Sequence, residues 1–202
     1  MTKNFWNNRY SDTAEFYYGT QPNEFLKSNT HVIFPGGNVL SLGEGEGRNA
    51  VFLAKLGFKV TAVDGSSVGM EKMEILAKGK QVSVAPVVSD LNEYKITPNG
   101  WDAIVSIWCH IPKILRKNLY AAVAKGLRPG GVFILEAYHP RQLEFKTGGP
   151  SDIDLLVRLE DLHEDLAGLN FIWEKELVRD ISEGKGHVGL SSVVQVICKK
   201  NS

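Results

Sequence analysis

The sequence has few of the features that mark secreted, membrane-bound or nucleic-acid-binding proteins. Its 202 residues include only two cysteines, Cys109 and Cys198, which lie far apart and have no metal-ligand spacing. No apolar run approaches the roughly 18 residues that a membrane span needs, and no apolar signal segment follows Met1. The 23 basic and 23 acidic residues balance, whereas nucleic-acid-binding proteins usually have a basic excess. We therefore expect a cytoplasmic protein without a bound metal, membrane contact or nucleic-acid partner.

The most informative segment that is present is a glycine turn within residues 39–50. An apolar run ends there at three alternating glycines, and a helical pattern begins directly after them. Glycine allows a tight turn and a close approach of the backbone to a ligand. About twenty residues later, the apolar run 59–63 ends in Asp64, whose carboxylate can accept both hydroxyls of an adenosine ribose. The pair predicts a nucleotide-like cofactor at the carboxyl ends of a parallel sheet.

Apolar runs alternate with helical patterns through the first two-thirds of the chain. We expect strands at 39–42, 59–63, 82–88, 102–107 and 132–138, and helices at 47–56, 66–79 and 112–126, the last with Pro112 in its first turn. This alternation predicts right-handed crossovers and a parallel sheet. The segment from Leu127 to Gly131 is expected to be a loop that ends a helix and leads into the fifth strand.

The last third of the chain has a different pattern. A helix is expected from about Asp152 to Leu166, with leucines at core spacing. Two strand-like runs, 170–180 and 187–199, are joined by a turn at 182–186, which predicts an antiparallel hairpin. His187 opens the second run, where we expect a solvated turn residue.

Four segments resemble motifs of the class I S-adenosylmethionine-dependent methyltransferases: 42–50, 62–67, 88–91 and 127–136. The variant Gly-Arg-Asn-Ala-Val-Phe-Leu-Ala in the first of them is most similar to small bacterial tellurite-resistance and thiopurine-type methyltransferases. The resemblance covers about residues 36–200. It implies an α/β, three-layer Rossmann-like fold with a mostly parallel seven-stranded sheet and an antiparallel C-terminal hairpin. It also implies a single domain, 1–202, with a lid or cap segment at 1–35 and a cofactor-binding core at 36–202.

The resemblance implies a site for S-adenosyl-L-methionine built from three motifs and the lid. The first motif contributes Gly43, Glu44, Gly45, Gly47 and Asn49, and the second contributes Asp64, Gly65 and Ser66, with the acid on the ribose. Asp90 and Leu91 of the third motif are expected near the adenine, and Trp108, Trp6, Tyr10 and Tyr18 complete the site. One departure is Ser41, where the family often has an acidic residue; Glu44 is expected to take over part of that polar role.

Several of these residues have a second interpretation. The glycine loop alone also fits the dinucleotide-binding pattern G-x-G-x-x-A. Asp64 and Asp90 could be turn residues, and Ser66 or Ser67 could cap the next helix. The aromatic N-terminal residues could form a packing face instead of a lid, although aromatic rings suit a sulfonium cation.

Side chains that follow the fourth and fifth strands are candidates for the methyl-accepting side. Because histidine ordinarily titrates near neutrality, His110 could act as a general base, and Tyr138 is a second catalytic candidate. His139 and Arg141 could line an acceptor pocket, whereas Cys109 is expected to be a small buried hydrophobe.

The predicted function is methyl transfer from S-adenosyl-L-methionine to a small molecule, such as a thiol or metalloid oxyanion, by in-line displacement, with S-adenosyl-L-homocysteine as the product. A soft or anionic acceptor needs no general base, whereas a hydroxyl or amine does. Two alternatives are an NAD(P)-dependent oxidoreductase, whose last strands would be parallel, and a cofactor-binding sensor without turnover. The acceptor, the base and the choice between monomer and homodimer stay open at this point.

Overall fold

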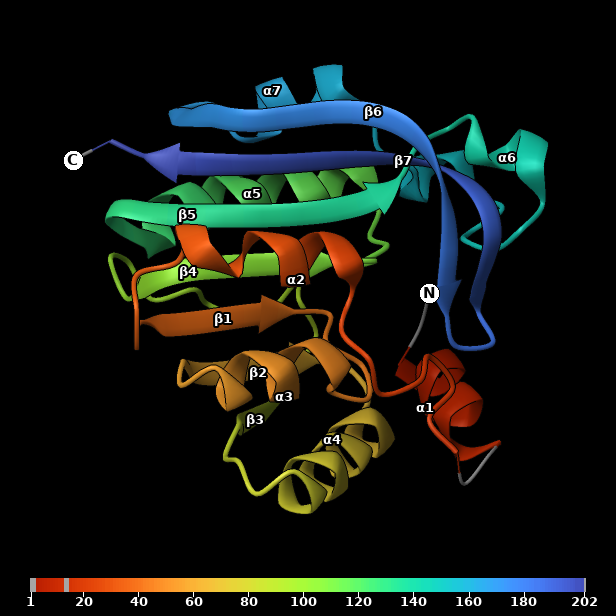
Figure 1. Ribbon diagram of the computed structural model, residues 1–202. Helices are drawn as coiled ribbons and strands as arrows, with labels where there is room; N and C mark the ends of the chain where they lie inside the picture. Colours follow the sequence, from red (N-terminus) through yellow and green to blue (C-terminus); the bar gives the residue numbers. More distant parts are fainter. Residues whose placement is uncertain (1–2, 13–14, 202) are drawn as a thin grey trace.

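A seven-stranded sheet forms the centre of the computed structural model, which describes residues 3–12 and 15–201 (Figure 1). Its strands are β1 (Asn38–Leu42), β2 (Lys59–Asp64), β3 (Ala85–Val88), β4 (Trp101–Ile107), β5 (Leu127–Tyr138), β6 (Leu169–Glu183) and β7 (His187–Lys200). In the order β3-β2-β1-β4-β5-β7-β6, the first five are parallel, and β7 is antiparallel to β5 and β6. The predicted fold class is confirmed. The antiparallel hairpin contradicts the oxidoreductase alternative, which requires parallel last strands.

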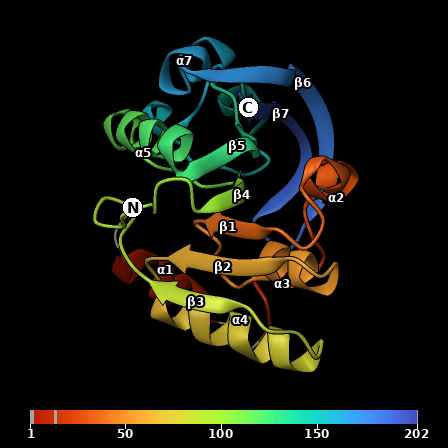
Figure 2. The same ribbon diagram turned by 90° about the vertical axis from the view of Figure 1, so that its left-hand side faces the viewer.

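Helices cover both faces of the sheet and make three layers (Figure 2). They are α1 (Lys3–Ser11), α2 (Glu24–Asn29), α3 (Arg48–Lys55), α4 (Ser67–Gly79), α5 (Lys113–Gly126), α6 (Gln142–Phe145) and α7 (Leu159–Asp165), with short 3₁₀ turns η1 (Thr30–Val32) and η2 (Ile153–Leu155). Successive strand residues point to opposite faces. Val39 therefore packs under α2 and α3, whereas Leu40 packs under α5 and α7, and both are fully buried.

The boundaries of three elements differ from the predicted ones. β3 begins three residues late because the Val82 amide donates to the Ala77 carbonyl and closes the end of α4. β5 begins at Leu127, which pairs with Trp101, so the glycine segment is an irregularity within the paired strand and not a separate loop. Pro112 is the N-cap of α5 and precedes its first turn.

The helix predicted over 152–166 is wrong in its first half. η2 is followed by extended residues, and α7 begins only at Leu159. The Val157 amide donates to the Tyr138 carbonyl at 2.9 Å, and Leu155, Leu156 and Val157 are all buried. Three consecutive buried residues do not fit one face of a helix, and the hydrogen bond to β5 holds this segment extended instead.

The β6–β7 hairpin extends beyond β5 and bends toward α1 (Figure 1). At its tip, the Lys185 amide donates to the Tyr17 carbonyl at 2.8 Å. A Cβ at Gly184 would lie 2.3 Å from the Tyr18 carbonyl carbon, so only glycine allows this approach. The hairpin therefore brings the last strand against the N-terminal segment.

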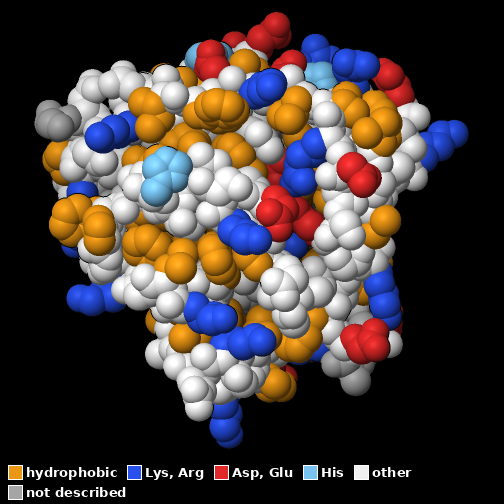
Figure 3. Space-filling model, in the orientation of Figure 1, with side chains coloured by type: hydrophobic (Ala, Val, Ile, Leu, Met, Phe, Trp, Pro, Cys, Tyr) orange, Lys and Arg blue, Asp and Glu red, His pale blue; other side chains and the backbone are white. Residues whose placement is uncertain are grey.

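The surface agrees with the charge balance of the sequence. Figure 3 shows basic and acidic side chains interspersed over the face seen in Figure 1. Within the described residues, no helix is long and apolar enough to cross a membrane. The cytoplasmic location, the single domain and its division at residue 35 stay predictions.

Candidate active site

A cavity of about 380 Å³ lies where the strand order reverses, beyond the carboxyl ends of β1, β2 and β4. This is the position at which open α/β sheets bind their ligands. Of the predicted cofactor-binding residues, seven from the three motifs line the cavity: Gly43, Glu44, Asn49, Asp64, Gly65, Asp90 and Leu91. The predicted aromatic residues also line it, together with the catalytic candidate His110: Trp6, Tyr10, Tyr18 and Trp108. The fold thus brings together residues from widely separated motifs.

The glycine loop lines the cavity with part of its residues and packs closely against Cys109 and α4 with its glycines. Gly43 has a φ of 62°, and a Cβ there would lie 2.6 Å from the sulfur of Cys109. Gly47 has a φ of 90°, and a Cβ there would lie 2.1 Å from Met73 of α4. Gly45 and Gly47 are not among the lining residues; they allow the loop to pack against its neighbours, and their contact with a cofactor stays a prediction.

Glu44 lies at the cavity wall and caps α3 at the same time. Its carboxylate accepts the amide hydrogens of Asn49 at 3.0 Å and Ala50 at 2.9 Å, and the hydroxyl of Ser41 also donates to it. Burial raises the pKa of Glu44, an effect that these hydrogen bonds oppose. Ser41 therefore supports Glu44, which supplies the carboxylate that the first motif lacks at position 41.

Asp64 is fixed by backbone amides in an orientation that leaves it able to bind a ligand. Its two oxygens accept the amide hydrogens of Gly45 and Ser66, each at 2.8 Å. A carboxylate has about four lone-pair positions, so each oxygen can still accept a hydroxyl hydrogen. Burial raises the pKa of Asp64. Ser66 itself does not line the cavity; its hydroxyl accepts from the Gly69 amide and caps α4, as the second interpretation of this residue holds.

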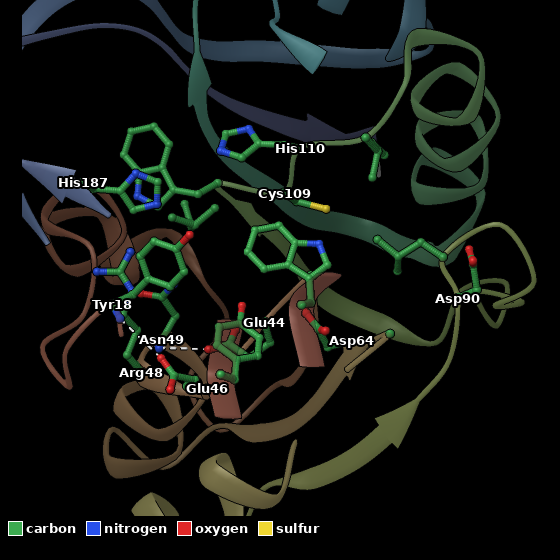
Figure 4. Close-up of a pocket in the computed structure, with 18 of the residues that line it drawn as sticks. Tyr18, Glu44, Glu46, Arg48, Asn49, Asp64, Asp90, Cys109, His110 and His187 are labelled. Atoms are coloured by element: carbon green, nitrogen blue, oxygen red, sulfur yellow. Dashed lines mark hydrogen bonds between the residues drawn. The ribbon is translucent and has the colours of Figure 1, made fainter. Parts of the chain in front are cut away.

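The cavity has two chemically different ends (Figure 4). Asp64 and Asp90 lie toward one end, Tyr18, Arg48 and His187 lie toward the other, and Cys109 lies between them. Carboxylates with free lone pairs suit hydroxyl and amino groups, and aromatic rings suit a cation. The donor set therefore fits a ligand with a ribose at one end and a sulfonium nearer the other.

A row of aromatic rings connects α1 to the hairpin. Trp6 stacks on Tyr10 with centroids 5.7 Å apart, Tyr10 meets Tyr18 edge-on at 6.4 Å, and Tyr18 stacks on His187 at 4.6 Å. His187 is only 4% exposed, which corrects the expectation of a solvated turn residue. The bend of the hairpin buries this ring, and burial lowers the pKa of His187.

The two catalytic candidates, His110 and Tyr138, differ in their position relative to the cavity: His110 lines it and Tyr138 does not. Both ring nitrogens of His110 are buried with no hydrogen-bond partner among the described residues, and burial lowers the pKa of His110 to about 4. Tyr138 is fully buried and does not line the cavity, because its hydroxyl lies 2.7 Å from His187 Nδ1 in the core behind it. Tyr138 therefore lies behind the cavity wall, where it supports His187, and its catalytic role stays a prediction. Burial also raises the pKa of Cys109 to about 12, as for an inert thiol.

Sequence reasoning missed two charged residues of the glycine loop and misplaced two others. Glu46 and Arg48 line the cavity, and their positions beside the glycines could have signalled this. His139 and Arg141, predicted near the acceptor, instead line a separate surface cavity of about 350 Å³ with Glu176. Among the residues that the structure describes, no cluster of His, Cys, Asp and Glu is arranged to hold a metal ion.

Comparisons with known proteins agree with this topology. A family model described as a methyltransferase domain matches residues 39–131, and no curated protein sequence matches the chain. TehB from Haemophilus influenzae has a TM-score of 0.75 at 18% identity, over 97% of this chain and 67% of that one. An S-adenosylmethionine-dependent methyltransferase from Clostridium acetobutylicum has a TM-score of 0.68 at 16% identity, over 98% and 99%. A protein studied for conversion of a disulfide bond into a thioacetal group in echinomycin biosynthesis has a TM-score of 0.78 at 16% identity, over 100% and 92%.

The sheet order and the antiparallel hairpin define a methyltransferase-type Rossmann-like fold, which the solved structures share. The matched domain contains β1 to β4 and the loops that surround the cavity. The chain is therefore similar in fold to solved S-adenosylmethionine-dependent methyltransferases, and its residues 39–131 match the methyltransferase-domain family.

Proposed function

We propose that the cavity binds S-adenosylmethionine with the adenosine toward Asp64 and Asp90 and the sulfonium toward the aromatic end, for methyl transfer to a small molecule. The observation that carries this proposal is the pair of carboxylates at one end of a cavity whose other end is aromatic. When bound, the cofactor supplies an activated methyl group, so the chain has mainly to orient donor and acceptor.

The adenosine end is the part built from the sequence motifs. Asp64 accepts the ribose hydroxyls through its remaining lone pairs, and Gly65 keeps the adjacent wall free of a side chain. Asp90 and Leu91 lie beside the adenine. Trp6 and Tyr10 of α1 close the cavity and exclude water from the reaction.

We propose a thiol or a metalloid oxyanion as the acceptor, because the predicted general base, His110, is a weak one. His110 is neutral at pH 7, and a pKa of about 4 makes it a poor proton acceptor. A thiolate or oxyanion arrives already able to attack, so no proton has to be removed. The sulfur chemistry of the echinomycin protein and the likeness to TehB support these two acceptor classes.

The proposed acceptor class is tested by measuring turnover with acceptors that differ in the reacting group. Thiol and hydroxyl compounds of the same carbon skeleton, and tellurite, are incubated with S-adenosylmethionine, and S-adenosylhomocysteine is measured by mass spectrometry. We expect product with a thiol or tellurite, and expect His110→Phe to retain turnover within about threefold, because no base is needed. Product with the hydroxyl compound alone, or loss of turnover in His110→Phe, would contradict the proposed acceptor class. Cofactor binding without product in any arm would favour the sensor alternative.

A further inference from the structure

A buried polar network lies directly behind the aromatic end of the cavity. Glu136 of β5 is fully buried and accepts hydrogen bonds from Arg179, Gln195 and Asn23. Glu183, the last residue of β6, is 6% exposed and shares two of these donors, Asn23 and Arg179. The network therefore connects the end of the hairpin to the sheet and to the start of α2.

Glu183 does not line the cavity, yet one of its oxygens binds two residues that do. Its Oε2 accepts from Trp108 Nε1 at 2.6 Å and from Arg48 at 2.5 Å. Its Oε1 accepts from Asn23 at 2.9 Å and Arg179 at 3.2 Å. Burial acts to raise the pKa of Glu183, but the charge of Arg48 and the hydrogen bonds from Arg48 and Trp108 hold it below the ordinary value. The carboxylate is therefore ionised.

The orientation of Trp108 depends on this carboxylate. Trp108 has a φ of 54°, an unusual value for a bulky residue, at the turn that follows β4. Its ring stacks on Tyr138 at 4.5 Å and on His187 at 5.1 Å. An indole can only donate, and a buried N–H needs an acceptor. Glu183 supplies that acceptor and therefore fixes the orientation of the Trp108 ring at the cavity wall.

The charge of Arg48 also depends on Glu183. Arg48 is the first residue of α3, and Figure 4 shows its side chain beside Tyr18 at the aromatic end. Besides Glu183, Arg48 donates a hydrogen bond to the neutral carbonyl of Gln21 at 3.4 Å. A buried, uncompensated guanidinium would repel a ligand cation strongly, because charges interact over longer distances in a low-dielectric interior.

We propose that Glu183 is a positioning residue for the methyl donor: it orients Trp108 and neutralises Arg48, so that the aromatic end of the cavity accepts the sulfonium cation. The proposal rests on the proposed cofactor site. It assigns a role in that site to the C-terminal hairpin, about 140 residues after the glycine loop.

The first test compares two ligands that differ in charge at sulfur. S-adenosylmethionine is a cation there, and S-adenosylhomocysteine is neutral. In Glu183→Gln, which keeps the side-chain shape, we expect calorimetry to show about tenfold weaker binding of S-adenosylmethionine and at most about twofold weaker binding of S-adenosylhomocysteine. Asp180→Asn is the matched control, since it removes the same charge from an exposed position of β6. Equal weakening of both ligands in Glu183→Gln would overturn the proposal.

Two further variants separate charge from folding. Adding Arg48→Gln to Glu183→Gln restores neutrality and should return the affinity ratio of the two ligands to the wild-type value. Arg48→Gln alone should shift the ratio in favour of S-adenosylmethionine, which keeps the test decisive if Glu183→Gln does not fold. Ratios that stay at the wild-type value in Arg48→Gln would contradict the charge argument. A wild-type protein that binds neither ligand would instead refute the proposed function.

The orientation of Trp108 is tested without any ligand. The indole N–H resonance of Trp108, assigned in a ¹H–¹⁵N spectrum by its loss in Trp108→Phe, reports the hydrogen bond to the carboxylate. We expect this resonance to move in Glu183→Gln and to stay in place in Asp180→Asn. An unchanged resonance in Glu183→Gln would show that the carboxylate does not hold the ring.

Discussion

The two ends of the cavity are built in different ways. The carboxylate end comes from loops that directly follow β1, β2 and β3, and Asp64 is fixed there by backbone amides two residues and nineteen residues away. The aromatic end combines α1, the turn after β4 and the hairpin, and its contacts join side chains such as Trp108 and Glu183, which lie 75 residues apart. One end is therefore encoded locally, whereas the other depends on the tertiary structure.

The largest effect is expected at the locally encoded end. Asp64→Ala removes a charged acceptor of two ligand hydroxyls and should weaken S-adenosylmethionine binding about a thousandfold, or about 4 kcal/mol. Calorimetry measures this change, and Asp154→Asn, an exposed acid on η2, is the control. If Asp64→Ala bound S-adenosylmethionine as tightly as the wild type, Asp64 would not be the residue that binds the ribose.

The second prediction concerns acid stability at the aromatic end. His110 keeps a pKa of about 4 in the folded protein against about 6.5 when unfolded, so its contribution is complete above pH 6.5 and is lost as the pH falls toward 4. The full contribution is about 3 kcal/mol. His110→Phe should remove this part of the pH dependence in denaturant unfolding between pH 7 and pH 4. His31→Phe, at an exposed position, should leave the dependence intact; equal slopes for wild type and His110→Phe would contradict the assignment.

The third prediction concerns the contact between the tip of the β6–β7 hairpin and the N-terminal segment at Tyr17 and Tyr18. Gly184→Ala places a methyl group against the backbone of Tyr18 and should weaken cofactor binding about tenfold. Gly168→Ala is the matched control, because Gly168 also has a positive φ but has open space around its Cβ position. Both variants should lose about 1 kcal/mol of stability through backbone strain, and Gly184→Ala should lose more because its methyl group also meets the Tyr18 backbone. Equal cofactor affinities in the two variants would show that the hairpin tip does not shape the site.

The smallest effect is expected for Ser66, which caps α4. Ser66→Ala removes the cap of α4 and should lower the free energy of unfolding by about 1 kcal/mol. Because its hydroxyl does not face the cavity, cofactor affinity should change less than twofold. Ser67→Ala, one residue further along α4, is the control. A tenfold loss of cofactor affinity in Ser66→Ala would instead support the predicted direct contact between Ser66 and the cofactor.

The difference between the two ends also explains which predictions were possible from the sequence. The alternation of strands and helices, the glycine loop and the placement of Asp64 at the cavity follow from local patterns, because a strand, a turn and a helix are adjacent in the chain. Sequence patterns could not place His187 or Tyr138. Both depend on the bend of the hairpin over β5, which buries one ring at the cavity and the other behind it.

The failed helix prediction has the same origin. Leucines at 155, 156, 159, 162 and 166 fit a helical period, but Leu155 ends the turn η2, and the hydrogen bond from Val157 to Tyr138 holds Leu156 and Val157 in an extended segment. Periodicity reports burial and cannot distinguish a helix from a short turn followed by a strand-like segment. Glu183 was missed because its partners lie in distant segments.

Side-by-side calorimetric titration with S-adenosylmethionine, S-adenosylhomocysteine and NADH tests the central claim most directly. We expect micromolar binding of the two sulfur compounds and no binding of NADH, with both affinities lost in Asp64→Ala. Binding of NADH alone, or binding of the sulfur compounds that Asp64→Ala leaves unchanged, would contradict it.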